Sequence, residues 1–361
     1  MTLAEHRIAR IQTRTIQNRY PREVGRNARL DVHGTGPASQ IRILTTDQGA
    51  VGWGLSWGDE AAVAPLLGRR VAELFDPAVG VLLEEALPLD FALHDLAGVL
   101  LGQPVYQMLG GQGPTHIPCY DGAIYIDDIL PEAAPRGIEA VLANCRADYA
   151  LGYRAFKLKI GRGHRWMEAE AGLRRDIEVT RRVREAFPDC YLLVDANDGY
   201  TCDGVLRYLE AVADCRLFWV EEPFPENRED LERLRAFLAE RSPQTLIADG
   251  ESNVDLDLVI SLAEAGLIDV LIMDIVGFGF TRWRQWMPRL ARQGIRTSPH
   301  TWGEPLKTYS VGHLAAGLGN VLTIEGIPAT SDDVDGSGYR LEQGLLRVPS
   351  EPGFGLRLQP S

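Results

Sequence analysis

Hydrophobic and polar positions follow different periods in the first third of the chain and in the rest. Two strand-like runs come first, at 8–16 and 41–57, and the second contains the turn sequence DQG between alternating segments, which is typical of a hairpin. Residues 59–110 then carry apolar side chains three and four positions apart, which predicts helices up to the stop at Gly110-Gly111. Strands followed by helices predict a small α+β domain over residues 1–114.

Beyond this domain, short apolar runs alternate with longer amphipathic stretches. This alternation predicts strands of a parallel sheet separated by helices. The number of strands favours a (β/α)8-type barrel over residues 115–327, and a doubly wound sheet is the alternative that the pattern alone leaves open. The eight runs are 117–124, 155–160, 191–197, 217–223, 245–251, 269–275, 295–300 and 321–326.

Two segments do not follow either period. The tail, 328–361, is rich in Gly, Pro and Ser and has short strand-like pieces, so we expect it to leave the barrel and return to the N-terminal domain. The segment 20–37 is long and polar, and loops of this length are usually functional or disordered.

Composition narrows the class of protein. The 361 residues include 37 Lys and Arg against 50 Asp and Glu, a net charge of −13, which disfavours a nucleic-acid partner and suits a bound cation. The five cysteines form no C-x-x-C pair, and we interpret them as reduced thiols. The N-terminus lacks an apolar signal core, and no apolar run reaches membrane length. We therefore expect a cytoplasmic protein without a membrane partner.

Ionisable residues stand at or near the ends of seven consecutive predicted barrel strands. From Lys159 onward they are separated by 36, 26, 30, 23, 26 and 25 residues, the repeat length of a βα unit. In a parallel barrel this position is the catalytic face, whereas a single such residue is usually a helix cap. The residues are Lys157 and Lys159, then Asp195, Glu221, Glu251, Asp274, His300 and Glu325.

Three acids from consecutive strands, Asp195, Glu221 and Glu251, suggest a metal site. Carboxylates that converge without a cation repel one another, and a hard divalent ion removes that cost. All-oxygen ligands suit Mg²⁺, whereas zinc is disfavoured because no His or Cys pattern accompanies the acids. The alternative is that the three acids are separate salt-bridge partners.

Two candidate bases lie on opposite parts of this register. Lys157 and Lys159 are two apart on one strand and face the same side, so we expect burial beside a cation to lower their pKa and make one of them a base. The alternative is that they extend outward to solvent. His300 follows the strand next to that of Asp274, and a carboxylate on one imidazole nitrogen would fix its tautomer.

These motifs together resemble the enolase superfamily, in its mandelate racemase-like branch. The resemblance is carried by FKLKIG, VDAN, WVEEP, DGES, MDIVGFG and SPHTWG in order, and by the helical sequence LDFALHDLAGVLLGQPVYQMLGG. It implies a modified TIM barrel, (β/α)7β, with an α+β capping domain formed by the N-terminal region and the C-terminal tail. It also implies a homo-oligomer and Mg²⁺ held by Asp195, Glu221 and Glu251, with Asp249 as a rival to Glu251.

The same resemblance implies roles for the remaining site residues. Lys159 would be one base with Lys157 as its electrostatic companion, and His300 with Asp274 would be the opposite base. Glu325 would hydrogen-bond the substrate carboxylate or enolate, and Asn197 of VDAN would contact substrate.

The shared chemistry is removal of the proton α to a carboxylate, which gives an enediolate. We expect a dehydratase that converts a sugar acid to a 2-keto-3-deoxy acid; a racemase or epimerase uses the same bases, and a barrel that binds acids without turnover is a third hypothesis. In the loop, Arg22 and Arg26, with Arg29 and His33 nearby, could clamp the distal end of the substrate, or could be solvated charges.

Overall fold

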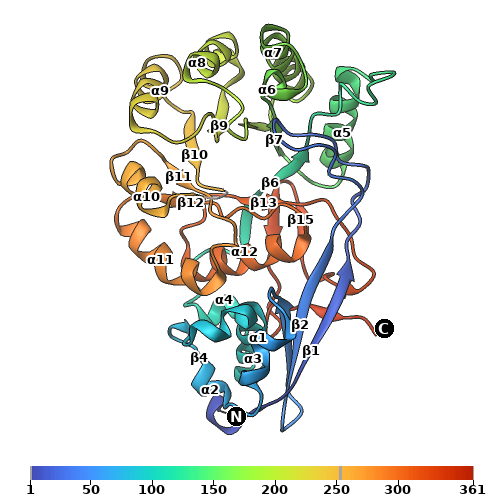
Figure 1. Ribbon diagram of the computed structural model, residues 1–361, viewed down its shortest axis with the longest axis vertical. Helices are drawn as coiled ribbons and strands as arrows, with labels where there is room; N and C mark the ends of the chain where they lie inside the picture. Colours follow the sequence, from blue (N-terminus) through green and yellow to red (C-terminus); the bar gives the residue numbers. More distant parts are fainter. Residues whose placement is uncertain (1, 252–253, 361) are drawn as a thin grey trace.

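The computed structural model describes residues 2–251 and 254–360, and it contains an N-terminal α+β domain beside a parallel barrel (Figure 1). The N-terminal sheet is antiparallel, in the order β1 (Ile8–Gln17), β2 (Ala38–Thr46) and β3 (Val51–Leu55), so the predicted strand and hairpin are confirmed. Helix α3 (Asp90–Leu101) covers this sheet and is apolar on most sides. The short elements of the domain are η1 (Leu3–Glu5), α1 (Glu60–Val63), η2 (Ala64–Leu66), α2 (Val71–Leu74), β4 (Phe75–Asp76), β5 (Gly80–Val81) and η3 (Glu84–Leu89).

The helical pattern before Gly110 is interrupted. Helix α3 ends at Leu101 because Gly102 takes a left-handed conformation, with φ of 66°. Pro104 then precedes a second short helix, α4 (Val105–Met108), and cannot continue the first. The three-to-four spacing of apolar residues therefore continues past the point where the helix itself is interrupted.

The barrel has the predicted eight parallel strands, each at one of the eight apolar runs. They follow the order β12-β11-β10-β9-β8-β7-β6, and β13 pairs with β6. A bridge between Thr297 and Val321 closes the ring, so the (β/α)7β barrel is confirmed. The strands are β6 (His116–Ile124), β7 (Ala155–Lys159), β8 (Tyr191–Asp195), β9 (Leu217–Glu221), β10 (Leu246–Asp249), β11 (Val270–Leu271), β12 (Arg296–Thr297) and β13 (Ile324–Gly326).

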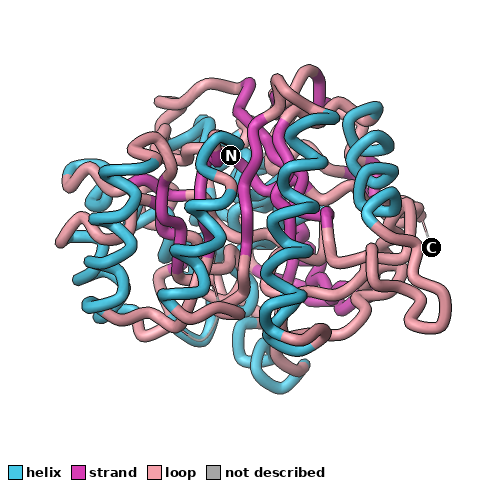
Figure 2. The backbone as a smooth tube through the Cα atoms, turned by 90° about the horizontal axis from the view of Figure 1, so that it is seen from above, coloured by secondary structure: helices cyan, strands magenta, loops and turns pink. Residues whose placement is uncertain are grey.

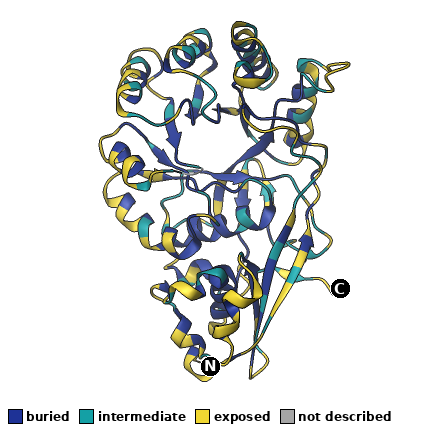
Figure 3. Cartoon of the chain, in the orientation of Figure 1, coloured by how far each residue is buried: buried dark blue, intermediate teal, exposed yellow. Residues whose placement is uncertain are grey.

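Helices follow the strands and lie outside them, as the view from above also shows (Figure 2). Their inner faces and the strands are buried, whereas the outer faces of the helices are exposed (Figure 3). The helical segments are α5 (Ile138–Ala150), α6 (Arg162–Arg165), α7 (Ala169–Ala186), α8 (Cys202–Ala211), η4 (Ala213–Cys215), α9 (Arg228–Arg241), α10 (Leu256–Glu264), α11 (Phe280–Arg292) and α12 (Pro305–Leu318).

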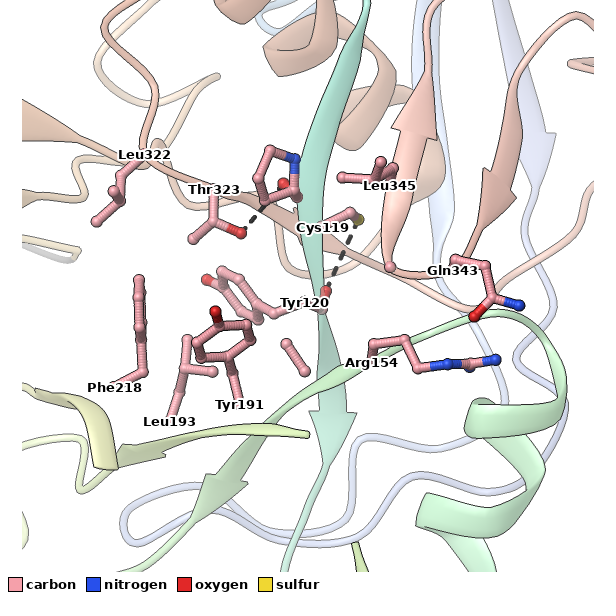
Figure 4. A pocket seen from close by; sticks show the side chains of 13 residues that line it. Cys119, Tyr120, Arg154, Tyr191, Leu193, Phe218, Leu322, Thr323, Gln343 and Leu345 are labelled. Atoms are coloured by element: carbon pink, nitrogen blue, oxygen red, sulfur yellow. Dashed lines mark hydrogen bonds between the residues drawn. The ribbon is translucent and has the colours of Figure 1, made fainter. Parts of the chain in front are cut away.

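The two ends of the barrel differ in chemistry. Towards the strand beginnings, a core of Tyr120, Leu193, Trp219 and their neighbours fills the interior. A hollow of about 310 Å³ opens there, lined mainly by apolar side chains that include Tyr191 and Phe218 (Figure 4). The ionisable residues lie at the opposite end, where the strands finish.

The C-terminal tail contacts both parts of the molecule. The hairpin of β15 (Arg340–Glu342) and β16 (Leu345–Arg347) extends the barrel sheet at β6, which the strand-like pieces alone did not predict. The tail also reaches the N-terminal domain, where Asp333 pairs with Arg14. Its other strands are β14 (Val334–Asp335) and β17 (Arg357–Leu358). Within the described chain, no helix combines the length and apolar character that a membrane crossing needs, and the five cysteines are buried free thiols.

Candidate active site

Three carboxylates meet where β8, β9 and β10 finish. Asp195 and Glu221 end neighbouring strands in register, and Glu251 follows the next strand. One oxygen of each acid lies within 4.8 Å of the others. Glu221 Oε2 and Glu251 Oε2 are buried and have no hydrogen-bond partner among the described residues, so they are available as ligands. This all-oxygen donor set fits a hard divalent cation.

Asp249 lies outside this cluster. It is fully buried, and its Oδ1 accepts a hydrogen bond from the backbone N–H of Gly250. Burial raises its pKa well above the ordinary value, which favours the neutral form. None of its oxygens belongs to the group of acid oxygens that lie within 4.8 Å of one another, whereas an oxygen of Glu251 does, so the geometry favours Glu251 over its rival.

Lys157 and Lys159 both point into the barrel beside the triad. Lys157 Nζ lies 2.6 Å from Glu221 Oε1 and 2.9 Å from Glu325 Oε1. Lys159 Nζ contacts Asp195 and lies 3.1 Å from Asn197 Oδ1. The outward orientation that the sequence left open does not occur.

In the metal-free protein the pKa values of both lysines shift upward, whereas our expectation was for lysines beside a bound cation. Burial lowers the pKa of Lys157, but Glu221 and Glu325 outweigh burial and raise it well above its ordinary value. Asp195 likewise outweighs burial and raises the pKa of Lys159. The expectation considered burial and a cation, but not the carboxylates that surround the ammonium groups in the metal-free protein.

Burial and the lysines divide the acids of the site into two groups. Burial raises the pKa of Glu221 to about 8. Burial would also raise the pKa of Glu325, but Lys157 and His300 reverse this effect and lower it to about 2. Glu325 Oε2 also accepts a hydrogen bond of 2.8 Å from the backbone N–H of Thr301, which holds this carboxylate at the barrel mouth.

His300 meets the metal triad at Glu251, whereas the lysines meet it at Asp195 and Glu221. Its Nδ1 lies 3.0 Å from Asp274 Oδ2, and its Nε2 lies 3.1 Å from Glu251 Oε1. The His300 hydrogen bond and Lys307 overcome burial and hold the pKa of Asp274 below its ordinary range, so this carboxylate is ionised and accepts the Nδ1 proton. Nε2 is therefore the nitrogen that faces the site.

Asn197 supports the lysine side of the site. Its backbone N–H donates to Asp195 Oδ1 at 2.9 Å, and its side-chain oxygen accepts from Lys159. Asn197 and Asp198 both adopt left-handed backbone conformations, with φ of 43° and 54°. Such backbone strain is often found at functional sites, and here it turns the Asn197 side chain back towards Lys159.

The loop arginines are engaged within the protein and do not join the acid–base cluster. Arg22 pairs with the buried Asp148, and Arg26 pairs with Asp31 and Glu132. Arg29 donates to the backbone oxygen of Asn197 at 2.7 Å and also pairs with Asp198. Asp148 and Glu132 are distant in the sequence, whereas Asp31 belongs to the same loop, and contact of Arg22 or Arg26 with a substrate stays a prediction.

The loop instead contributes aromatic rings beside the site. The His33 ring meets Tyr125 at 4.6 Å and Trp302 at 5.8 Å between centroids, and Tyr20 stacks on Trp302. Tyr125 lies 5.2 Å from Lys159 Nζ, so this aromatic wall borders the lysine side. Burial lowers the pKa of His33, which favours a neutral ring.

Sequence reasoning missed Lys307, whose Nζ lies 2.9 Å from Asp274 Oδ2. It belongs to the first turn of α12 and not to a strand end, so the βα register could not reveal it. The aromatic wall was also missed, because its members come from separate loops. The signal that could have found Lys307 is its position seven residues after His300.

Known proteins share this fold over its whole length. Two structures of galacturonate dehydratase from Geobacillus sp. are 33% identical, with a TM-score of 0.92; they cover 98% and 99% of this chain and 93% and 95% of theirs. One is complexed with Mg, and the other with D-galacturonate and 5-keto-4-deoxy-D-galacturonate.

Curated relatives include both lyases and isomerases. D-xylonate dehydratase from Haloferax volcanii is 26% identical over 98% of this chain and 93% of its own length. D-galactarolactone cycloisomerase from Agrobacterium fabrum is 27% identical over 87% of each chain. The family model described as "Enolase C-terminal domain-like" matches residues 140–361. With the capping sheet, the barrel and the acidic triad in place, the chain belongs to the enolase superfamily.

Proposed function

We propose that this protein is a Mg²⁺-dependent dehydratase that converts a sugar acid to a 2-keto-3-deoxy acid. The observation that carries the proposal is the placement of a lysine pair and a His–Asp dyad on two sides of one carboxylate triad. Two acid–base groups across a metal site suit removal of a proton from one carbon and protonation of a leaving group on the next.

Asp195, Glu221 and Glu251 would hold Mg²⁺, which when bound supplies positive charge against the substrate carboxylate and the enediolate. The lysines add positive charge at the same point. Lys157 is held between Glu221 and Glu325, so its ammonium group is fixed without reorganisation during the reaction.

With its carboxylate neighbours neutralised by the cation, Lys159 would lose the proton that it holds in the metal-free protein, and in this neutral form it takes the α-proton onto Nζ. The electron pair of the broken C–H bond forms the enediolate and then expels the hydroxyl group from the β-carbon. His300 donates its Nε2 proton to that hydroxyl group, which leaves as water, and the enol product tautomerises to the 2-keto acid. Lys159 and His300 can exchange these roles, because each side carries one proton-transfer group.

The relatives support elimination of water over inversion. Counted from the carboxylate of D-galacturonate, the 5-keto-4-deoxy compound bound to the Geobacillus enzyme is a 2-keto-3-deoxy acid. D-xylonate dehydratase points to the same reaction class. Epimerisation is the second candidate, since a two-base site can return the proton to the opposite face.

The internal pairing of the loop arginines favours a substrate with a single carboxylate. Arg22, Arg26 and Arg29 bind protein acceptors, and the wall beside Lys159 is aromatic, with a neutral His33. A neutral polyhydroxy end suits this wall better than a second anionic group. The cytoplasmic location and the homo-oligomeric state stay predictions.

The test is incubation of the Mg²⁺-loaded protein with D-galacturonate and a series of aldonates, with semicarbazone detection of 2-keto acids. A 2-keto-3-deoxy product supports the proposal. A stereoisomer of the substrate as sole product replaces it with epimerisation. Tight binding of an acid without any product supports the non-catalytic hypothesis instead.

Mutation of the two bases identifies their roles. If Lys159 takes the α-proton, His300→Asn blocks turnover while the α-proton still exchanges with D₂O. If His300 takes it, His300→Asn abolishes exchange and Lys159→Met retains it. Near-normal turnover by His300→Asn contradicts a two-base site.

A further inference from the structure

All three lysines of this chain lie in one place. Among the 37 basic residues, only Lys157, Lys159 and Lys307 are lysines, and the others are arginines. Two of them form the pair on β7, and the third contacts Asp274 of the opposite dyad. Ion pairs elsewhere in the described chain use arginine or histidine, so the compact ammonium group is confined to this site.

The local structure around Lys307 does not itself favour a cation. Lys307 lies in the first turn of α12, a helix of 14 residues, and a positive charge near a helix N-terminus opposes the helix dipole. Its side chain is 16% exposed. Two acceptors compensate, because Nζ donates to Asp274 Oδ2 at 2.9 Å and to the backbone oxygen of Trp302 at 3.2 Å.

Lys307 completes the set of donors to the Asp274 carboxylate. Oδ1 accepts from the backbone N–H groups of Val276 and Gly277, both at 2.8 Å. Oδ2 accepts from His300 Nδ1 at 3.0 Å and from Lys307. Without Lys307, the imidazole would be the sole donor to Oδ2 in the described structure, and the carboxylate could rotate with it.

We propose that Lys307 is a positioning residue, which fixes the Asp274 carboxylate and through it directs His300 Nε2 towards the substrate. The ammonium group joins Asp274, after β11, to the Trp302 segment, after β12, and to the start of α12. Three segments that meet at the barrel mouth are thereby held by one cation. The consequence for turnover rests on the proposed dehydration, whereas the orientation of the imidazole does not.

The kinetic experiment compares Lys307→Met with Lys307→Arg in Mg²⁺-loaded protein on the best substrate found. Loss of an orienting group of this kind typically costs about 10- to 100-fold in activity, so Lys307→Met lowers kcat by that factor with KM changed less than about threefold. Lys307→Arg keeps the charge and a donor, and recovers most of the loss. Arg289→Met is the matched control, because Arg289 is an exposed helix cation that pairs with Glu264.

A second readout is independent of turnover. In ¹⁵N-histidine NMR, at a pH high enough to leave the imidazole neutral, His300 of the native protein, assigned with His300→Asn, shows a single tautomer protonated at Nδ1, and Lys307→Met shows a mixture. Asp274→Asn gives the reference spectrum for a lost carboxylate.

An unchanged His300 signal together with kcat within twofold of the native value in Lys307→Met overturns the inference. An equal loss of kcat in Lys307→Met and Lys307→Arg, without any change of tautomer, also overturns it. If the native protein dehydrates no acid but Lys307→Met still alters the tautomer, the proposed reaction fails and the positioning role stands.

Discussion

Two buried charge clusters lie three residues apart on the chain and behave differently. Lys159 ends β7 in the metal triad, whereas Arg162 begins α6 between Asp128 and Asp176. Both cations are almost completely buried. Lys159 and Arg162 come from the same βα connection. The difference between their clusters therefore depends on the acids that pair with each cation and not on where the cations lie in the fold.

The Arg162 cluster is closed. Its guanidinium donates to Asp128 and contacts Asp176, and Asp176 also accepts from the backbone N–H of Gly161 and the hydroxyl of Tyr200. Each carboxylate oxygen of Asp128 and Asp176 accepts at least one hydrogen bond, from the Arg162 guanidinium or from another donor. Such a cluster holds the connection between β7 and α7 in place.

The metal-site cluster is open. Two lysines face four carboxylates, from Asp195, Glu221, Glu251 and Glu325, and two carboxylate oxygens lack partners in the described structure. An excess of buried negative charge with free acceptors is unfavourable unless a cation joins it. Burial of charge is therefore common to both clusters, and incomplete pairing is what distinguishes the metal-site cluster from the Arg162 cluster.

The largest effect should come from removal of a metal ligand. Glu221→Gln should reduce activity by at least about 10³-fold with the fold intact, because it takes away a ligand charge, and chelation should abolish activity until Mg²⁺ is restored. Turnover and calorimetric Mg²⁺ titration check this expectation.

Glu222→Gln is the matched control for the metal titration. Glu222 is the next residue, it is also buried, and burial already raises its pKa well above the ordinary value, so an amide resembles its neutral form. The Mg²⁺ affinity of the Glu222→Gln variant should stay within about threefold of the native value. Full activity in excess chelator would remove the metal from the mechanism.

Mutation of the closed cluster should affect stability instead of chemistry. Arg162→Met leaves Asp128 and Asp176 without their main cation, and breaking a buried pair costs about 3 kcal/mol or more. We expect a loss of stability near the lower value, because Tyr200 and Gly161 still donate hydrogen bonds to Asp176. Denaturant unfolding measures the loss, and Mg²⁺ affinity of the folded variant should be unchanged. A stable variant with weakened metal binding would contradict the division into two clusters.

The sequence predicted the open cluster better than the closed one. Asp195, Glu221, Asp274, His300 and Glu325 recur at the βα repeat, and a parallel barrel brings strand ends together whatever the loops do. Their placement therefore follows from periodicity. The direction of the lysine pKa shifts did not follow, because it depends on which carboxylates lie within a few ångströms.

Partners that lie far apart in the sequence carried no local signal. Arg22 donates to Asp148, 126 residues away, and Arg29 donates to Asp198, 169 residues away. Neither pair has a spacing that a helix or strand would mark. The interruption at Gly102 was likewise masked, since the apolar period on its two sides is the same.

The pH dependence of metal binding should separate the clusters further. Burial raises the pKa of Glu221 to about 8, so below that pH a cation must displace its proton. Apparent Mg²⁺ affinity should therefore rise about tenfold per pH unit between pH 6 and 7 and level off above pH 8. Calorimetry in buffers of different ionisation enthalpy should detect the proton released.

The same shift has a defined sign for stability. In the metal-free protein, Glu221 contributes to the free energy of unfolding through its raised pKa. This contribution is fully present below the ordinary glutamate pKa of 4.5 and is lost as the pH rises through about 8. Glu221→Gln should remove both this dependence and the slope of metal affinity. A native protein with pH-independent Mg²⁺ affinity from pH 6 to 8 would show that Glu221 is already ionised.

The smallest expected effect concerns the loop, whose arginines resemble Arg162 and not the lysines. Arg22 is bound by the buried Asp148, whereas Arg26 is bound by Asp31 and Glu132, which are largely exposed, so these arginines have partners but are less enclosed than Arg162. A second carboxylate on the substrate would have to break such a pair or face the aromatic wall of Tyr125 and Trp302, where Lys159, 5.2 Å from the Tyr125 ring, already pairs with Asp195. If either route costs about 1.4 kcal/mol, the preference is tenfold. The kcat/KM for a uronate or aldonate should therefore exceed that for the aldarate of the same configuration by about this factor.

Arg26→Met should leave this ratio of kcat/KM values unchanged if Arg26 serves only the loop. An aldarate preferred over its monoacid, with the preference lost in Arg26→Met, would show that this pair opens to bind substrate and that the loop belongs with the open cluster.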